Sequence, residues 1–376
     1  MSAAPEYDIA ILGGGLAGLS LAVRLAAPGF RHLRVLVAEE RTDYARDRTW
    51  CAWRLGPHPF DAAVTHRWRR WAVSGPGGRV ERMASGVQYE RIPADRFHAV
   101  ALEKVAAAPN IELRQGVRAV PAEDAEGVSL GLAGGERARL AFDTRPPPGL
   151  GRHGLAQRFL GQEVRVERPI FDPECLVLMD LVPATEGVHF TYVLPMSATC
   201  ALVEDTWFAP PGAVLPDHRG ALRAWLQAQG AGQHQVLFEE SGCLPMDPCF
   251  RPVRGRRLVP LGGAAGAHRP ATGYAFAAIQ KQCDEVCRHI PDALAAGQAP
   301  HARRRSAAVR GMDRMWLALL ARRPGLAPRL FAGLFEHCPA SRLVRFLGDR
   351  PRAGDLAAVA LATARGLLEA APGRSR

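Results

Sequence analysis

The chain opens with a strand-like run that leads directly into a glycine-rich loop and then into a helical run. Residues 7–12 are apolar and strand-forming, the following GGGLAG carries the spacing Gly-x-Gly-x-x-Gly, and residues 19–26 are helix-forming. In this context Gly13 permits a tight turn, Gly15 lets a pyrophosphate approach the backbone, and Gly18 lets helix and strand pack closely. The helix N-terminus supplies the positive end for phosphates. The pattern predicts a Rossmann-like dinucleotide-binding unit.

The next strand ends in an acidic residue at the position where ribose hydroxyls are bound. Residues 33–38 are strand-like and Glu39 follows them, 26 residues after Gly13. This arrangement alone fits either NAD or FAD. A single motif at the start of 376 residues, with no second motif downstream, favours a flavoprotein whose nucleotide domain is completed by later segments.

A later glycine-rich loop is suited to that completing role. Residues 257–261 read as a strand, Gly262 and Gly263 follow it, and residues 275–289 read as a helix. We expect Gly262 and Gly263 to present backbone N–H groups near the pyrophosphate and the flavin, which closes an FAD site.

The middle of the chain is rich in strand signals. Residues 164–182 and 236–246 are strand-like, and residues 188–195 and 200–208 read as a hairpin. Such a sheet, inserted between two parts of a nucleotide domain, fits a roof over a flavin and a large apolar cavity. A purely structural sheet is the alternative.

Two carboxylates, Glu204 and Asp205, lie within the apolar run 201–209 on the second strand of this hairpin. Neighbouring side chains on a strand point to opposite faces. A carboxyl group in apolar surroundings holds its proton near neutral pH, as a general acid must. The alternatives are an edge strand with both carboxylates solvated, or a salt bridge to an arginine.

The positive charge of the chain is concentrated in its last part. The net charge is +11, and residues 301–376 contribute 15 Arg against 3 Asp and 2 Glu. Short apolar patches at 316–320, 330–335 and 343–347 lie among these arginines. This pattern predicts helices on an anionic bilayer surface, with a plain solvated helical face as the alternative. No nucleic-acid motif accompanies the charge, so nucleic acid is not an expected partner.

Cysteine usage and the chain start predict a cytoplasmic protein. The eight cysteines form no CxxC pair, so we expect reduced thiols and no metal site. The first residues lack the basic region of a signal peptide, and no apolar run is long enough to span a bilayer.

We therefore expect an α/β fold with an α+β insert. Residues 1–85, 100–160 and 250–300 are predicted to form a discontinuous Rossmann-like FAD-binding domain of the flavin hydroxylase type. Residues 161–249, with parts of 50–100, are predicted to form a β-rich substrate domain. Residues 301–376 are predicted to form a basic, helical, membrane-facing tail.

With these residues assembled, the chain resembles the FAD-dependent carotenoid cyclase family, which includes bacterial lycopene β-cyclases. The resemblance covers nearly the whole length. It rests on Asp8 with Gly13 to Gly18, on residues 47–53 (DRTWCAW), 142–146 (FDTRP), 157–161 (QRFLG) and 190–197 (FTYVLPMS) with Glu204-Asp205-Thr206, and on 270–274 (PATGY). Ala271 and the pair His268-Arg269 depart from the family pattern, in which a threonine and a pair of histidines are common.

The resemblance implies the chemistry. An acid protonates the terminal double bond of a ψ end group of lycopene, the C5–C6 double bond attacks the cation at C1, and loss of the C6 proton leaves a β-ionone ring. Lycopene would become γ-carotene and then β-carotene without net redox change. The resemblance further implies reduced FAD, NAD(P)H as reductant, Arg48 as a cofactor-binding residue, peripheral attachment to the inner face of the cell membrane, and other carotenoid-pathway enzymes as possible partners.

Several readings of the site stay open from sequence. Glu204 is the family-matched essential carboxylate and can be proton donor, base or anionic stabiliser; Asp205 is a secondary candidate on the opposite face. A flavin-dependent hydroxylase, an isoprenoid double-bond reductase and a non-catalytic flavin- or carotenoid-binding protein are the competing functions.

Overall fold

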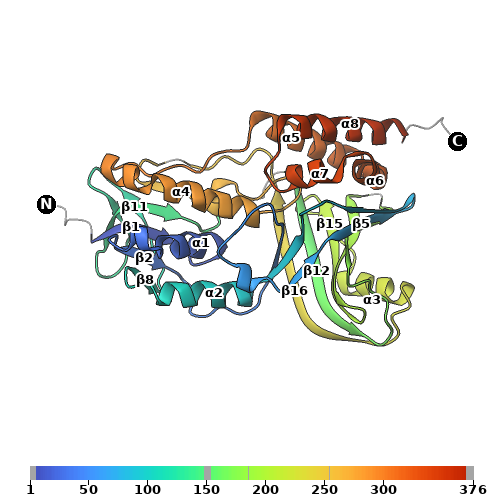
Figure 1. Ribbon diagram of the computed structural model, residues 1–376, viewed down its shortest axis with the longest axis horizontal. Coiled ribbons are helices and arrows are strands. Elements are labelled where there is room, and N and C mark those ends of the chain that lie inside the picture. Colours follow the sequence, from blue (N-terminus) through green and yellow to red (C-terminus); the bar gives the residue numbers. More distant parts are fainter. Residues whose placement is uncertain (1–5, 148–153, 185, 254, 370–376) are drawn as a thin grey trace.

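The computed structural model describes residues 6–147, 154–184, 186–253 and 255–369. Its two large sheets lie side by side along the long axis of the molecule, and a group of C-terminal helices covers one side of the second sheet (Figure 1). The glycine-rich loop of the N-terminus faces the junction between the two parts.

The first sheet is the nucleotide-binding one. Its strands, in spatial order, are β8 (Ile111–Arg114), β2 (Val35–Ala38), β1 (Tyr7–Leu12), β11 (Arg137–Asp143), β10 (Val128–Ser129) and β9 (Ala122–Glu123), with β17 (Leu258–Pro260) also paired to β11. The strands β8, β2, β1, β11 and β17 are parallel. The late strand β17 thus joins a sheet begun 250 residues earlier, as expected from the sequence.

Both faces of this sheet are covered, which explains why its strands read as continuous apolar runs. Ile9 and Ile11 of β1 pack towards the helices α1 (Leu16–Leu25), α2 (Ala94–Ala106) and α4 (Phe276–Ala296). Ala10 and Leu12 point to a separate cluster on the other face. The helix α4 continues beyond the predicted end at residue 289 and contains Pro291.

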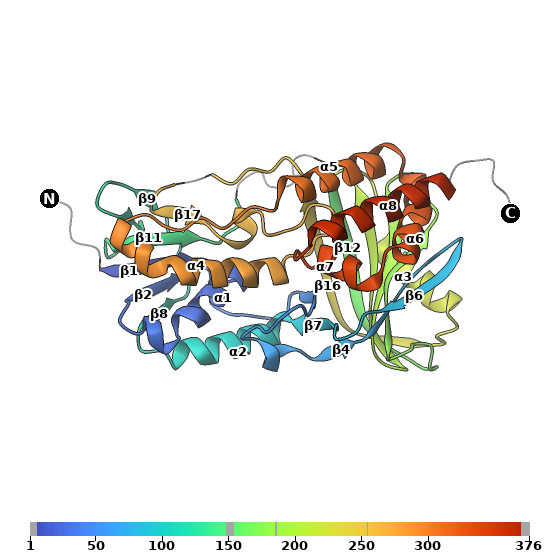
Figure 2. The same cartoon turned by 45° about the horizontal axis from the view of Figure 1, so that its top comes forward.

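The second sheet is mixed and strongly elongated. Its strands, in spatial order, are β16 (His234–Met246), β12 (Leu155–Val166), β15 (Cys200–Ala209), β14 (Val188–Ser197), β13 (Cys175–Val182), β5 (Arg70–Gly75) and β6 (Gly78–Met83). The predicted hairpin is confirmed as β14 and β15, which pair in antiparallel register with Tyr192 opposite Glu204. A small third sheet, β3 (Thr49–Trp53), β7 (Tyr89–Pro93) and β4 (His66–Trp68), lies between the two larger ones (Figure 2).

Helices cover both faces of the second sheet. One face packs on α3 (His218–Ala228) through an apolar cluster that includes Val203 and Leu222. The other face packs, through Leu202 and Phe208, on the C-terminal helices. These are α5 (Ala307–Arg322), α6 (Ala327–His337), α7 (Ala340–Leu347) and α8 (Ala353–Glu369). Within the residues that the structure describes, every helix is too short or too polar to cross a bilayer.

Some arginines of the basic C-terminal region are internal rather than surface groups. Arg305 pairs with Asp349 at 2.5 Å and donates to the carbonyl oxygens of Gly266 and Ala267. Arg345 pairs with the buried Asp355 at 2.6 Å. These contacts tie the helices to one another and to the loop after β17.

Candidate active site

The glycine-rich loop has the geometry that phosphate binding requires. Gly13 has φ +100°, a conformation that favours glycine. A Cβ on Gly18 would lie 1.8 Å from the carbonyl oxygen of Gly13, so only glycine allows this approach of helix and strand. No side chain caps the N-terminus of α1 at Gly15, and the first turn contains no acidic residue. Its N–H groups are thus available to an anion.

Most of the predicted cofactor residues line one cavity of about 1880 Å³. These are Gly13, Gly15, Glu39, Arg48 and Gly263. The carboxylate of Glu39 accepts from the backbone N–H of Gly14 at 2.5 Å, and Arg48 pairs with Asp47 at 2.6 Å.

The remaining two predicted residues, Gly18 and Gly262, lie outside the cavity lining. A Cβ on Gly262 would meet the Cβ of Ala17 at 2.3 Å. Both glycines therefore serve close packing around α1, and their predicted role in cofactor binding stays a prediction.

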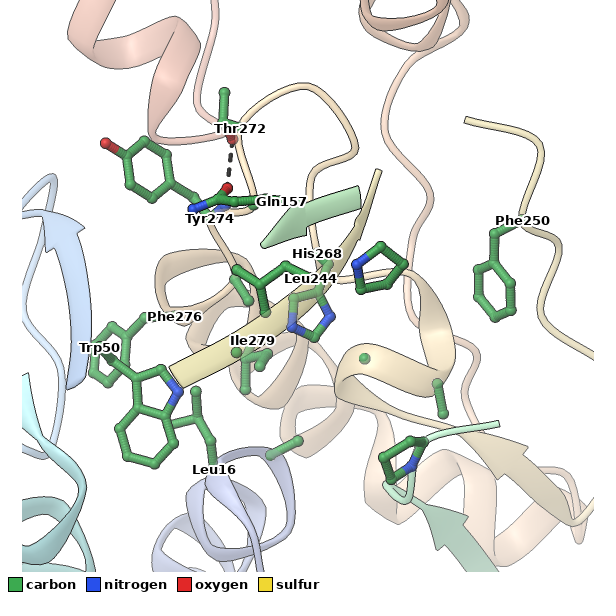
Figure 3. Close-up of a pocket in the computed structure, with 18 of the residues that line it drawn as sticks. Leu16, Trp50, Gln157, Leu244, Phe250, His268, Thr272, Tyr274, Phe276 and Ile279 are labelled. Carbon is green, nitrogen blue, oxygen red and sulfur yellow. Dashed lines mark hydrogen bonds between the residues drawn. The ribbon is translucent and has the colours of Figure 1, made fainter. Parts of the chain in front are cut away.

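Unpartnered polar atoms in the cavity wall indicate a polar ligand. Both ring nitrogens of His98, Nδ1 of His268 and Oε1 of Gln157 are buried and lack a hydrogen-bond partner among the described residues. All three residues line the cavity, and Figure 3 shows His268 and Gln157 on this wall. Burial, together with Arg41 and Arg305 respectively, lowers the pKa of His98 and of His268 to about 4. These neutral rings and the open N-terminus of α1 fit a dinucleotide such as FAD.

The same cavity continues past the nucleotide loops to the second sheet and the C-terminal helices. Here its lining is apolar and aromatic, with Phe190 and Phe208 from the sheet and Trp316, Phe331 and Val359 from the helices. Trp50, Leu16 and Ile279 border the part next to α1 (Figure 3). One space thus joins a polar wall suited to a nucleotide with an apolar compartment.

Glu204 of the hairpin belongs to the wall of this cavity. Its side chain lines the cavity and is 9 % exposed. Among the described residues, no group hydrogen-bonds its carboxyl. Burial, followed by the charge of Glu240, raises the pKa of Glu204 well above its ordinary value. The protonated form of Glu204 is therefore favoured, in line with the expectation from its apolar neighbours.

Three tyrosines form a hydroxyl cluster beside Glu204. Tyr89 Oη lies 3.0 Å from Tyr192 Oη and donates to Tyr274 Oη at 3.2 Å. Tyr192 is the register partner of Glu204, and Tyr274 ends the PATGY motif. Burial raises the pKa of all three phenols, so they remain neutral.

A second carboxylate near Glu204 was not found by sequence reasoning. Glu240 of β16 and Glu204 of β15 are both register partners of Gly161 on the strand between them. A Cβ on Gly161 would lie 2.7 Å from Cγ of Glu204 and 3.5 Å from Cγ of Glu240. Glu240 is 5 % exposed and accepts from Thr49 Oγ1 at 2.9 Å. Glu240 and Glu204 come together only through the pairing of three strands around Gly161, which the local sequence does not reveal.

Asp205 lies on the opposite face of β15, as predicted. Its carboxylate contacts His189 Nε2 at 2.5 Å and His218 Nδ1 of α3 at 2.6 Å, and His189 stacks on Trp207. Asp205 is absent from the cavity lining. The carboxylate joins the sheet to α3 and favours a structural role, and the secondary catalytic role of Asp205 stays a prediction.

The departure from the family pattern at Arg269 has a structural partner. Arg269 is fully buried, pairs with Asp313 of α5 at 2.9 Å, and lies over the ring of Phe346 of α7. The loop after β17 is thereby fixed to the C-terminal helices. A buried charge of this kind is stable only with its partner in place.

Solved structures that resemble this fold include a flavin-dependent enzyme. A geranylgeranyl bacteriochlorophyll reductase-like protein from Thermoplasma acidophilum superimposes with a TM-score of 0.65 at 14 % identity, covering 98 % of this chain and 99 % of its own. The flavin-dependent monooxygenase PieE, solved with FAD and substrate, superimposes with a TM-score of 0.60 at 15 % identity, covering 97 % and 72 %. The expected fold class, a Rossmann-like FAD-binding fold with mixed sheets and a helical C-terminal region, is confirmed.

The sequence relatives identify the family, whereas the solved structures identify only the fold. Lycopene beta-cyclase from Pseudescherichia vulneris is 32 % identical over 287 residues, or 72 % of this chain and 70 % of that protein. Lycopene beta-cyclase from Paracoccus sp. is 26 % identical over 353 residues, or 89 % and 84 %. The family model described as lycopene cyclase protein matches residues 8–368. The chain therefore belongs to the lycopene cyclase family.

Proposed function

We propose that this enzyme binds FAD and cyclises the ψ end groups of lycopene to β-ionone rings, by way of γ-carotene to β-carotene. The observation that carries the proposal is Glu204, a buried carboxyl with a raised pKa in a cavity that the nucleotide-binding loop and aromatic side chains also line. Cyclisation of an alkene begins with protonation, and an acid in an apolar cavity is the group this step requires.

In this proposal Glu204 is the proton donor. It transfers its proton to the terminal double bond, the cation forms at C1, and the C5–C6 double bond closes the ring. The carboxylate left on Glu204 then removes the C6 proton, so the acid is restored and no atom is gained or lost. The separate roles of donor and base, left open by the sequence, are thus combined in one group.

The cavity wall stabilises the positive charge. The aromatic residues Phe190 and Tyr192 line the same space as Glu204, and aromatic faces attract cations. The loops around Gly13 and Gly263 would hold FAD, whose reduced ring supplies an electron-rich surface for the cation when bound. NAD(P)H is the proposed external reductant, and it does not enter the isomerisation itself.

We also propose that the C-terminal helices rest on the cytoplasmic face of a membrane. Met315 of α5 and Ala360 of α8 are exposed and at the same time line the cavity, so the cavity reaches the surface at these helices. Leu361 and Leu368 of α8 are each 71 % exposed. An apolar rim of this kind suits entry of a polyene from lipid.

Expression in a lycopene-accumulating bacterial host tests the function. We expect cyclic carotenoids with the mass of lycopene, because cyclisation is an isomerisation. A gain of two hydrogens would indicate a double-bond reductase, and a gain of oxygen would indicate a hydroxylase. An acyclic pigment in the presence of soluble, flavin-loaded protein would reject the proposal.

The Glu204→Gln variant tests the role of the acid. We expect it to lose cyclisation by at least about a hundredfold with flavin absorption unchanged, because the amide cannot donate a proton to carbon. Retained activity in flavin-loaded Glu204→Gln would remove Glu204 from the mechanism.

A further inference from the structure

Glu204 and Glu240 form a carboxyl pair that the register of three strands holds together. Both flank Gly161 of β12, one from β15 and one from β16, and both lie on the same side of that glycine. A Cβ at position 161 would collide with Glu204, so glycine leaves the space that the two side chains fill. We propose that Glu240 is a positioning residue that holds the proton on Glu204, the two carboxyls sharing one proton.

The surroundings of Glu240 favour its anionic form. Thr49 Oγ1 donates to its carboxylate, and Arg46, before β3, and Arg91, on β7, act on its charge. Asp47 opposes them. Both arginines also pair with Glu163, at 2.6 and 2.8 Å, so their positions are fixed.

The surroundings of Glu204 offer no such support. The neutral groups Tyr192, Tyr274 and Cys51 lie near it, and the pKa of each is raised chiefly by burial. Burial also raises the pKa of both carboxyls, while a hydrogen bond and two cations oppose the rise only at Glu240. When two close carboxyls cannot both ionise, the better supported one loses its proton first.

This inference rests on the proposed function for its catalytic meaning. Glu240 is absent from the cavity lining, so it acts through Glu204 and not on the substrate. Its negative charge disfavours ionisation of Glu204 before substrate arrives, and it favours return of the C6 proton to the same oxygen afterwards. One proton leaves the pair and one comes back in each ring closure.

Infrared titration of the flavin-loaded protein tests the pair without any substrate. We expect a neutral carboxyl band that persists well above the pH at which an ordinary glutamate ionises. It should be lost at neutral pH in Glu204→Gln, and it should titrate at lower pH in Glu240→Gln. The inference is overturned if the band survives in Glu204→Gln and disappears in Glu240→Gln, because Glu240 would then hold the proton.

The pH profile of cyclisation tests the consequence. Activity that depends on the acid form of Glu204 is present below its pKa and lost as pH rises. Removal of the charge on Glu240 lowers the pKa of Glu204. The activity of Glu240→Gln should therefore fall at a pH about one unit or more below that of the wild type. The matched control is Glu239→Gln, next in sequence but bonded to Arg219 and Gln162 on the other face. Its profile should equal that of the wild type.

The outcomes separate the two proposals. If the wild type shows the neutral carboxyl band but forms no cyclic product, the proposed function alone is rejected. If the wild type cyclises lycopene but Glu240→Gln changes neither the infrared titration nor the pH profile, the carboxyl pair alone is rejected. If Glu240→Gln does not fold, Thr49→Val removes the hydrogen bond and should move the first ionisation of the pair to higher pH; an unmoved ionisation would overturn the pair.

Discussion

Glu204 is placed where a charged carboxylate would destabilise the folded chain. An ordinary glutamate ionises near pH 4.5, whereas the pKa of Glu204 in the folded protein is well above that value. At pH values between 4.5 and the pKa of the folded state, the folded chain binds more protons than the unfolded chain. The free energy of unfolding therefore falls as pH rises through this range. The arrangement that gives the acid its proton therefore has a cost in stability.

Glu204→Gln should consequently be more stable than the wild type at alkaline pH. We expect the difference to grow by at most about 1.4 kcal/mol for each pH unit above pH 4.5, up to the pKa of the folded state, because the amide has no proton to lose. Thermal unfolding of both flavin-loaded proteins from pH 5 to pH 9 measures it. Equal pH dependence in the two proteins would show that Glu204 ionises normally when folded.

At the scale of the element, the strand β15 serves two purposes through its alternation. Its even-numbered residues 202–208 face the cavity side and its odd-numbered neighbours face α3. The period of two places the acid and the structural carboxylate Asp205 on opposite sides within two consecutive residues.

Asp205→Asn should weaken the attachment of α3 and leave the chemistry intact. Loss of charge at a buried carboxylate between His189 and His218 should lower the free energy of unfolding by about 1–3 kcal/mol. We expect the same cyclisation rate per flavin-loaded molecule below the melting temperature. A fall in rate without a fall in melting temperature would return Asp205 to the catalytic residues.

The elements near Glu204 were predictable where a local pattern specifies them. The loop at Gly13 and the hairpin at 188–208 carry their own turn and alternation signals, and both are confirmed. Glu240 was missed because it follows another glutamate and its hydrogen-bond partner Thr49 lies 191 residues away in the chain. Long-range strand register, not local sequence, creates the pair.

At the scale of the whole molecule, the cavity is built by segments from both ends of the chain. Gly15 of α1 and Val359 of α8 line the same space. The sequence indicated a basic helical end, but the pattern of charge did not distinguish arginines that pair internally, such as Arg305, from those that face outward. Only the tertiary arrangement separates the two sets.

Outward-facing arginines on α5 and after it give the membrane proposal its test. Arg314, Arg322 and Arg323 are exposed and have no partner among the described residues. At about 1 kcal/mol for each charge near an anionic surface, changing all three to glutamine should weaken binding to phosphatidylserine-containing vesicles by about a hundredfold. Vesicle co-sedimentation at low salt measures this, and binding should also fall with added salt.

A matched triple variant removes the same charge from the nucleotide-binding part. Arg31, Arg96 and Arg288 are exposed there and likewise lack a partner among the described residues. Changing these three to glutamine should leave vesicle binding nearly unchanged, because charge on that part acts on lipid only within about 10 Å. Equal loss in the two triple variants would mean that overall charge, and not the α5–α8 surface, brings the protein to the membrane.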